Sequence, residues 1–123
     1  MASTKGTALI LEDEPLIAMD VENTLREAGH DVSIVSTCVE ATEWLKRRRP
    51  DIVIADVVLR DGPCHDVVEQ MVRDQIPFVV HSGNLADAHV GTPYAHGTWL
   101  NKPSLPDDLL AAVKQAMSNP GQP

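Results

Sequence analysis

The stretch Ala8-Leu9-Ile10-Leu11-Glu12-Asp13-Glu14-Pro15 places an apolar run of strand length directly before three acidic residues. A second run, Ile52-Val53-Ile54-Ala55, leads in the same way into Asp56, and Trp99-Leu100-Asn101 leads into Lys102. In a parallel α/β sheet the carboxyl ends of the strands lie along one edge, where ligands bind. These residues can therefore meet in one acidic pocket with a cation beside it. Such a pocket suits Mg²⁺ and a phosphoryl group, because Mg²⁺ takes carboxylate oxygens and keeps several waters.

The whole chain alternates between strand-like and helix-like segments. We expect strands at residues 7–11, 31–36, 51–56, 77–81 and 98–101. The spacing of apolar residues predicts helices from Pro15 to Gly29, over residues 38–49 and 63–74, and after Ser104, which is expected to cap the last helix. Alternating elements of this size imply a doubly wound parallel sheet with right-handed crossovers.

The interval between Ser82 and Thr98 departs from this alternation. Its three glycines and one proline leave room for about two helical turns, and few apolar residues could anchor them. We therefore predict a short or degenerate fourth helix here. A segment so weakly packed belongs to the low-stability part of a domain, so fast hydrogen exchange is expected in residues 83–97.

Composition excludes several classes of protein. The 123 residues fit one domain, and a net charge of −8 argues against a nucleic-acid-binding surface. There is no apolar stretch long enough for a membrane span, and no signal-peptide core precedes the first strand. The protein is therefore expected to be cytoplasmic, without a membrane partner. Disulfides are uncommon in that compartment, so Cys38 and Cys64 are expected to be reduced thiols.

Four motifs, in this order, resemble the response regulator receiver domain of two-component signalling. They are Leu11-Glu12-Asp13-Glu14-Pro15, Asp56 at a strand end, Ser82 after Phe78-Val79-Val80-His81, and Lys102-Pro103. Each motif alone is weak, but each stands at the end of an expected strand. The resemblance covers residues 7–117 and implies a flavodoxin-like, five-stranded (βα)5 domain, with 118–123 as a flexible tail.

The resemblance also implies a chemistry. Asp56 would be the phosphoacceptor, and Mg²⁺ would be bound directly by Asp13 and Asp56. The backbone carbonyl of Val58 would add a third oxygen, and Glu12 would act through a water molecule. Lys102 and the Ser82 hydroxyl would bind the phosphoryl oxygens. An anionic nucleophile that attacks an anionic phosphoryl group needs this neutralisation of charge.

Other positions follow the family pattern less closely. Trp99 stands where receivers carry an aromatic switch, although it could equally be a half-buried aromatic of an edge strand, with Tyr94 serving as the switch instead. The pattern implies a cis bond before Pro103. Receivers usually have Pro where Arg60 stands and Gly where Cys64 stands, which puts the usual partner-binding surface in doubt.

The last expected helix ends near the end of the chain, so a stand-alone receiver is expected. As a phosphoacceptor in signalling, it is expected not to be an enzyme. Its partners would be a sensor histidine kinase or a histidine phosphotransfer protein, and an unknown downstream protein. Two alternatives stay open. One is a receiver-fold adaptor that works without phosphorylation. The other is a haloacid-dehalogenase-type phosphatase, which would need a second Asp where Val58 stands.

Overall fold

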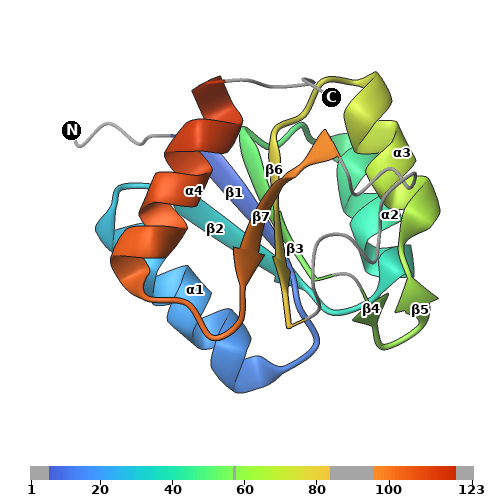
Figure 1. Ribbon diagram of the computed structural model, residues 1–123. Coiled ribbons are helices and arrows are strands. Elements are labelled where there is room, and N and C mark those ends of the chain that lie inside the picture. Colours follow the sequence, from blue (N-terminus) through green and yellow to red (C-terminus); the bar gives the residue numbers. More distant parts are fainter. Residues whose placement is uncertain (1–5, 57, 84–95, 119–123) are drawn as a thin grey trace.

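The computed structural model describes residues 6–56, 58–83 and 96–118. Strands and helices alternate up to residue 82, with one short hairpin inserted, and one strand and one helix follow between residues 98 and 118 (Figure 1). The strands are β1 (Thr7–Leu11), β2 (Asp31–Val35), β3 (Ile52–Ala55), β4 (Val58–Leu59), β5 (Gly62–Pro63), β6 (Phe78–Ser82) and β7 (Thr98–Asn101). The helices are α1 (Pro15–Glu27), α2 (Cys38–Arg47), α3 (His65–Arg73) and α4 (Pro106–Ser118).

The central sheet has five parallel strands in the order β2-β1-β3-β6-β7. The first strand, β1, lies inside the sheet, and β2 forms one edge beside it. The remaining strands β3, β6 and β7 follow in order on the other side of β1 (Figure 1). This is the flavodoxin-like order, so the predicted fold class is confirmed. The register sets Leu11 opposite Ala55 and Ser82 opposite Asn101, which aligns the carboxyl ends of the strands along one edge.

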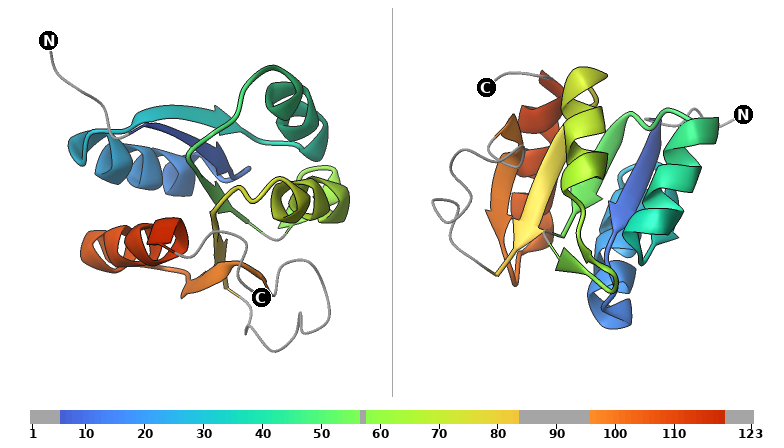
Figure 2. Two further views of the ribbon diagram at one scale, coloured as in Figure 1. Left: turned by 90° about the horizontal axis from the view of Figure 1, so that it is seen from above. Right: turned by 90° about the vertical axis from the view of Figure 1, so that its right-hand side faces the viewer.

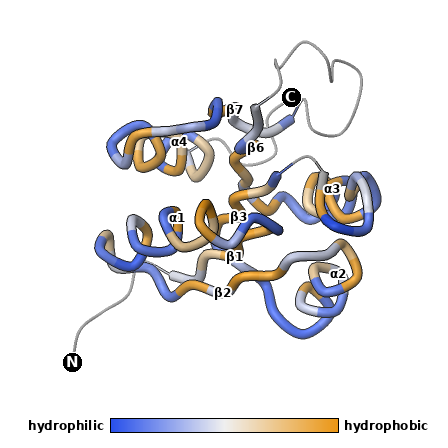
Figure 3. The backbone as a smooth tube through the Cα atoms, turned by 90° about the horizontal axis from the view of Figure 1, so that it is seen from below, coloured by the Kyte–Doolittle hydropathy of each residue, from blue (hydrophilic) through white to orange (hydrophobic). Residues whose placement is uncertain are grey.

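Two pairs of helices cover the sheet, with α1 and α4 on one face and α2 and α3 on the other (Figure 2). Successive strand residues point to opposite faces, so Leu9 and Val53 pack under α2 and α3, whereas Ile10 and Ile52 pack under α1 and α4. All of β3 is buried, because both of its faces are covered. In Figure 3 the strands between the two helix layers are coloured mostly as hydrophobic residues.

Several predicted boundaries were wrong. The helix predicted over residues 63–74 is α3, which begins only at His65, because Gly62–Pro63 forms the strand β5 of a two-stranded antiparallel hairpin with β4. The last helix begins at Pro106, and its first helical hydrogen bond runs from the Leu109 N–H to the Leu105 carbonyl; the N-cap position is therefore Leu105, not the predicted Ser104. The predicted short fourth helix, at residues 84–95, and the tail from 119 lie outside the described residues.

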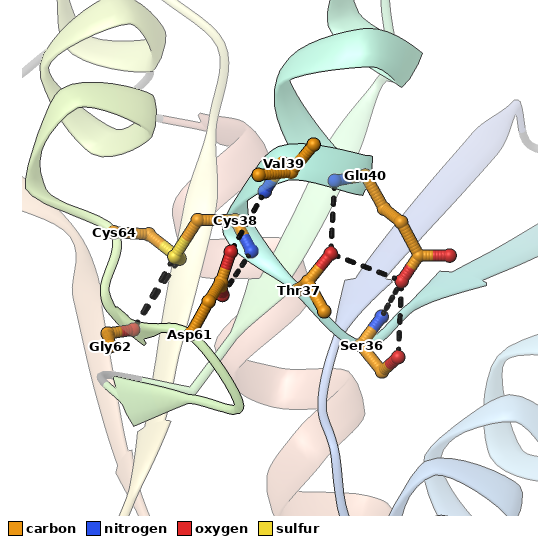
Figure 4. The surroundings of a disulfide bond; sticks show 8 residues. All are labelled: Ser36, Thr37, Cys38, Val39, Glu40, Asp61, Gly62 and Cys64. Atoms are coloured by element: carbon orange, nitrogen blue, oxygen red, sulfur yellow. Dashed lines mark hydrogen bonds between the residues drawn. A yellow bond between two sulfur atoms is a disulfide. The ribbon is translucent and has the colours of Figure 1, made fainter.

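The prediction of two reduced cysteines is also wrong. Cys38 and Cys64 form a disulfide, with their Cα atoms 5.4 Å apart (Figure 4). The prediction rested on the expected compartment alone. It did not anticipate that the β4–β5 hairpin turns the chain back, so that Cys64 meets the first residue of α2.

Within residues 6–56, 58–83 and 96–118, every helix is too short or too polar to cross a bilayer.

Candidate functional site

Three carboxylates gather at the carboxyl edge of the sheet. Glu12 and Asp13 follow β1, and Asp56 follows the adjacent strand β3. The two strand ends are joined by a hydrogen bond from the Asp56 N–H to the Leu11 carbonyl, at 2.9 Å. As a result, one carboxylate oxygen from each of the three residues lies within 4.8 Å of the others. The three carboxylates predicted to meet at this edge therefore do lie together.

Lys102 reaches this cluster from β7 across the intervening strand β6. Its backbone N–H donates to the Ser82 carbonyl at 2.9 Å, which holds the start of the Lys102 loop against the end of β6. Its Nζ lies 2.7 Å from Glu12 Oε1 and 3.0 Å from Asp56 Oδ2. The Lys102–Pro103 peptide bond is cis, as the family pattern implied. The predicted cation beside the acidic residues is thus in place.

Burial controls the electrostatics of the cluster. The Glu12 side chain is 3% exposed, and its burial raises the pKa of the carboxyl, although hydrogen bonds from Lys102 and the Glu14 N–H oppose this rise. Burial also disfavours the Lys102 ammonium, but hydrogen bonds to Glu12 and Asp56 outweigh it and raise the Lys102 pKa. Lys102 therefore stays protonated at neutral pH.

The donor set fits a hard divalent cation. With all groups ionised, the three carboxylates and one ammonium leave two net negative charges in a pocket made of oxygen ligands. Mg²⁺ favours such oxygens and retains part of its water shell, so the partly exposed Asp13 and Asp56 are suitable ligands. Val58 lies in β4 opposite Pro63, and its predicted carbonyl contact with the cation stays a prediction.

The remaining predicted residues lie on or beyond β6 and β7. Ser82 ends β6 and is buried, with 2% of its surface exposed. Trp99 pairs with Val80 in the sheet and is half-buried against the core under α2 and α3. This position agrees with the simpler interpretation of Trp99 as an edge-strand aromatic, and its role as a switch stays a prediction. Tyr94 lies outside the described residues.

The sequence analysis missed His81. The residue is buried on β6, and its Nε2 lies 3.0 Å from the Ser104 hydroxyl oxygen. Burial lowers the pKa of the imidazole to about 4, and the nearby Lys102 charge adds to this effect. His81 lines a cavity of about 330 Å³ between α1 and the start of α4, next to Lys102 and Ser104. A histidine in an otherwise apolar strand was the available signal.

Comparison with known proteins identifies a family and several similar proteins. Residues 8–114 match the family model of the response regulator receiver domain. Similar proteins include the phyllosphere-induced regulator PhyR of Methylorubrum extorquens, 31% identical over 113 residues, and the transcriptional regulatory protein PdtaR of Mycobacterium tuberculosis, 34% identical over 123 residues. These matches cover 89% and 95% of this chain but only 42% of PhyR and 59% of PdtaR. The chain thus spans less than two thirds of either relative.

Solved structures agree with the sequence matches. The solution structure of the receiver domain of PhyR from Erythrobacter litoralis has a TM-score of 0.81 and 28% sequence identity, over 98% of this chain and 95% of that one. A putative response regulator from Chloroflexus aurantiacus also has a TM-score of 0.81, with 26% identity over 93% of this chain and 98% of that one.

Proposed function

This chain belongs to the response regulator receiver family, and we propose that it accepts a phosphoryl group on Asp56 from a histidine kinase or a histidine phosphotransfer protein. One observation carries the proposal. The Asp56 carboxylate lies at the carboxyl edge of the sheet, contacts the Lys102 ammonium at 3.0 Å, and shares a pocket with Glu12 and Asp13. A nucleophile, a compensating cation and ligands for a divalent metal are therefore within reach of one another.

In the proposed reaction a carboxylate oxygen of Asp56 attacks the phosphorus of a phosphohistidine. A P–O bond forms, the P–N bond breaks, and its electron pair stays on the imidazole of the donor, which leaves as a neutral base after taking up a proton. The product is an acyl phosphate on Asp56. Lys102 contacts the carboxylate before transfer, and the same ammonium can follow the negative charge onto the phosphoryl oxygens.

The carboxylates would hold the divalent cation. Asp13 and Asp56 would bind it directly, Glu12 would act through water, and the Val58 carbonyl would complete the set of protein ligands. When bound, the metal neutralises charge on the transferring phosphoryl group and helps to align it with the nucleophile. Glu12 is oriented for this role by two contacts, because Oε1 accepts from Lys102 and Oε2 accepts from the Glu14 N–H at 3.1 Å.

The output would be a change in protein–protein binding. Ser82 stands at the end of β6, where its hydroxyl can donate to a phosphoryl oxygen, and the backbone of Lys102 is bonded to the Ser82 carbonyl. Movement of Ser82 would therefore be passed to the loop after β7 and to the adjoining segment 83–97, of which residues 84–95 lie outside the described part of the chain. The single-domain organisation of the protein stays a prediction.

Incubation with acetyl phosphate and Mg²⁺, followed by intact mass measurement, tests the proposal. The wild type should gain the mass of one phosphoryl group, and Asp56→Asn should gain none while keeping its fold. Wild-type protein that stays unmodified would favour an adaptor that works without phosphorylation. Phosphorylation of the Asn variant would show that the acceptor is a different residue.

A further inference from the structure

The disulfide sits beside the phosphoacceptor loop. Cys38 is the first residue of α2, and Cys64 follows β5 and precedes α3 (Figure 4). The chain that runs from Asp56 to Cys64 contains the β4–β5 hairpin, including Val58. The segment from Asp56 to Cys64 therefore carries the proposed nucleophile at its first residue and is attached to α2 by the disulfide at its last.

Other contacts hold the same hairpin against α2. The Asp61 carboxylate accepts hydrogen bonds from the N–H groups of Cys38 and Val39, at 2.7 and 3.2 Å (Figure 4). The Arg60 N–H also approaches the Ser36 carbonyl, at 3.5 Å. Both interactions involve exposed groups, which water can replace at little cost. The disulfide is the covalent member of this set, so it has the largest effect on how closely the hairpin is held.

The bond is also within reach of a thiol. Cys64 is buried, with 2% of its surface exposed, but Cys38 is half-buried and opens onto a cavity of about 240 Å³. Besides the two cysteines, the cavity is lined by apolar, polar and acidic side chains: Val39, Thr42, Glu43, Pro63, Asp66 and Val67. Cys38 is the more exposed of the two cysteines, so we take its Sγ as the atom that a thiolate in this cavity attacks.

We propose that Cys38–Cys64 is a reversible redox site, and that its oxidation state sets how readily the pocket at Asp56 takes up its divalent cation and phosphoryl group. The co-reactant is a dithiol, either a small molecule or a protein. The proposed effect on the pocket at Asp56 rests on the proposed function, whereas the redox site itself does not.

The exchange balances in two steps. A thiolate of the dithiol attacks Cys38 Sγ, the Sγ–Sγ bond breaks, and its electron pair leaves on Cys64 Sγ, which takes up a proton. The second thiol of the reductant then loses its proton and attacks the mixed disulfide, and Cys38 leaves as a thiolate that is protonated in turn. Two electrons and two protons pass to the protein, and the reductant becomes a disulfide.

The oxidised form should bind the cation more tightly. With the disulfide intact, the hairpin that contains Val58 is held in place before the metal arrives. After reduction, binding must also order this part of the chain. Re-ordering about one backbone residue corresponds to roughly a 5- to 30-fold weaker affinity. Phosphorylation by acetyl phosphate at limiting Mg²⁺ should slow by a similar factor.

Thiol labelling tests the redox site by itself. Air-oxidised protein should take up no alkylating agent without denaturant, and protein reduced by dithiothreitol should take up two equivalents, as measured by intact mass. Re-oxidation with oxidised dithiothreitol should abolish labelling again. Two free thiols in the oxidised sample, or a disulfide that resists native reduction, would overturn the inference and leave the proposed function untouched.

Two measurements on oxidised and reduced wild type then test the coupling between the disulfide and the Asp56 site. Calorimetric titration gives the Mg²⁺ affinity, and incubation with acetyl phosphate gives the rate of phosphorylation. The matched control is Cys38→Ser/Cys64→Ala, which should behave like the reduced protein and ignore dithiothreitol. If this variant does not fold, the comparison of oxidised with reduced wild type still tests the coupling. Equal Mg²⁺ affinities and rates in both samples would overturn the coupling. Absence of phosphorylation in both, with reversible labelling, would instead contradict the proposed function.

Discussion

Replacing Lys102 by methionine removes the ammonium that neutralises the buried Glu12 carboxylate, and keeps a side chain of similar length. Without divalent metal, Glu12 then either stays charged and uncompensated or takes up a proton. At pH 7, protonation of a carboxyl with the ordinary pKa of 4.5 costs at most about 3.4 kcal/mol. Burial already raises the Glu12 pKa, and the variant no longer buries an ammonium, so both effects reduce the cost. We expect Lys102→Met to lose about 2 kcal/mol of stability at pH 7.

The loss should depend on pH in a defined direction. In the variant, the pKa of Glu12 in the folded state lies even further above its value in the unfolded chain. The folded state therefore binds a proton that the unfolded state does not, and stability recovers as the pH falls toward 4.5. At pH 5 the same protonation costs at most about 0.7 kcal/mol. Urea unfolding of both proteins at pH 7 and pH 5, with EDTA present, measures this. An unchanged stability at pH 7, or a larger loss at pH 5, would refute the reasoning.

Three further perturbations probe other parts of the molecule. Millimolar Mg²⁺ should raise the melting temperature of the wild type, and less so in Asp13→Ala; an equal rise in both would count against a metal ligand at Asp13. His81 has a pKa of about 4 in the folded state and 6.5 when unfolded, so only the unfolded chain is protonated between these values. The wild type should therefore gain up to about 2 kcal/mol relative to His81→Gln between pH 5 and pH 8, and parallel stability curves would contradict this. A Cβ at Gly97 would collide with the Phe78 ring, so Gly97→Ala should lower the free energy of unfolding in urea by about 1–3 kcal/mol. At Gly83 a Cβ meets open space, so Gly83→Ala should leave the stability nearly unchanged, and equal losses in the two variants would contradict this.

The fold and the centre of the site could be predicted because each depends on local patterns. Apolar runs of three or four residues marked β1, β3 and β6, and parallel pairing then required their ends to meet. Asp56 and Lys102 each stand directly after a strand, so topology alone placed them at one edge. The Lys102 side chain then reaches across β6 to contact Asp56 at 3.0 Å.

Features that depend on tertiary contacts could not be predicted in this way. The strands β4 and β5 have two residues each, too few to show an alternating pattern. The disulfide depends on that hairpin, and the 26 positions that separate its cysteines give no indication that they meet. Ser104 has the chemistry of a helix cap, but the competing hydrogen bond with His81 becomes visible only when β6 and the loop before α4 are side by side.

Chemical identification of the modified residue tests the central claim most directly. The protein is incubated with acetyl phosphate with and without Mg²⁺, and the acyl phosphate is reduced with borohydride, which converts a phosphorylated aspartate to homoserine. Peptide mass spectrometry then locates the product. We predict homoserine at position 56 alone, and only in the sample that contained Mg²⁺. Homoserine at position 13 or at any other position, or no conversion with Mg²⁺ present, would contradict the assignment of Asp56 as the phosphoacceptor.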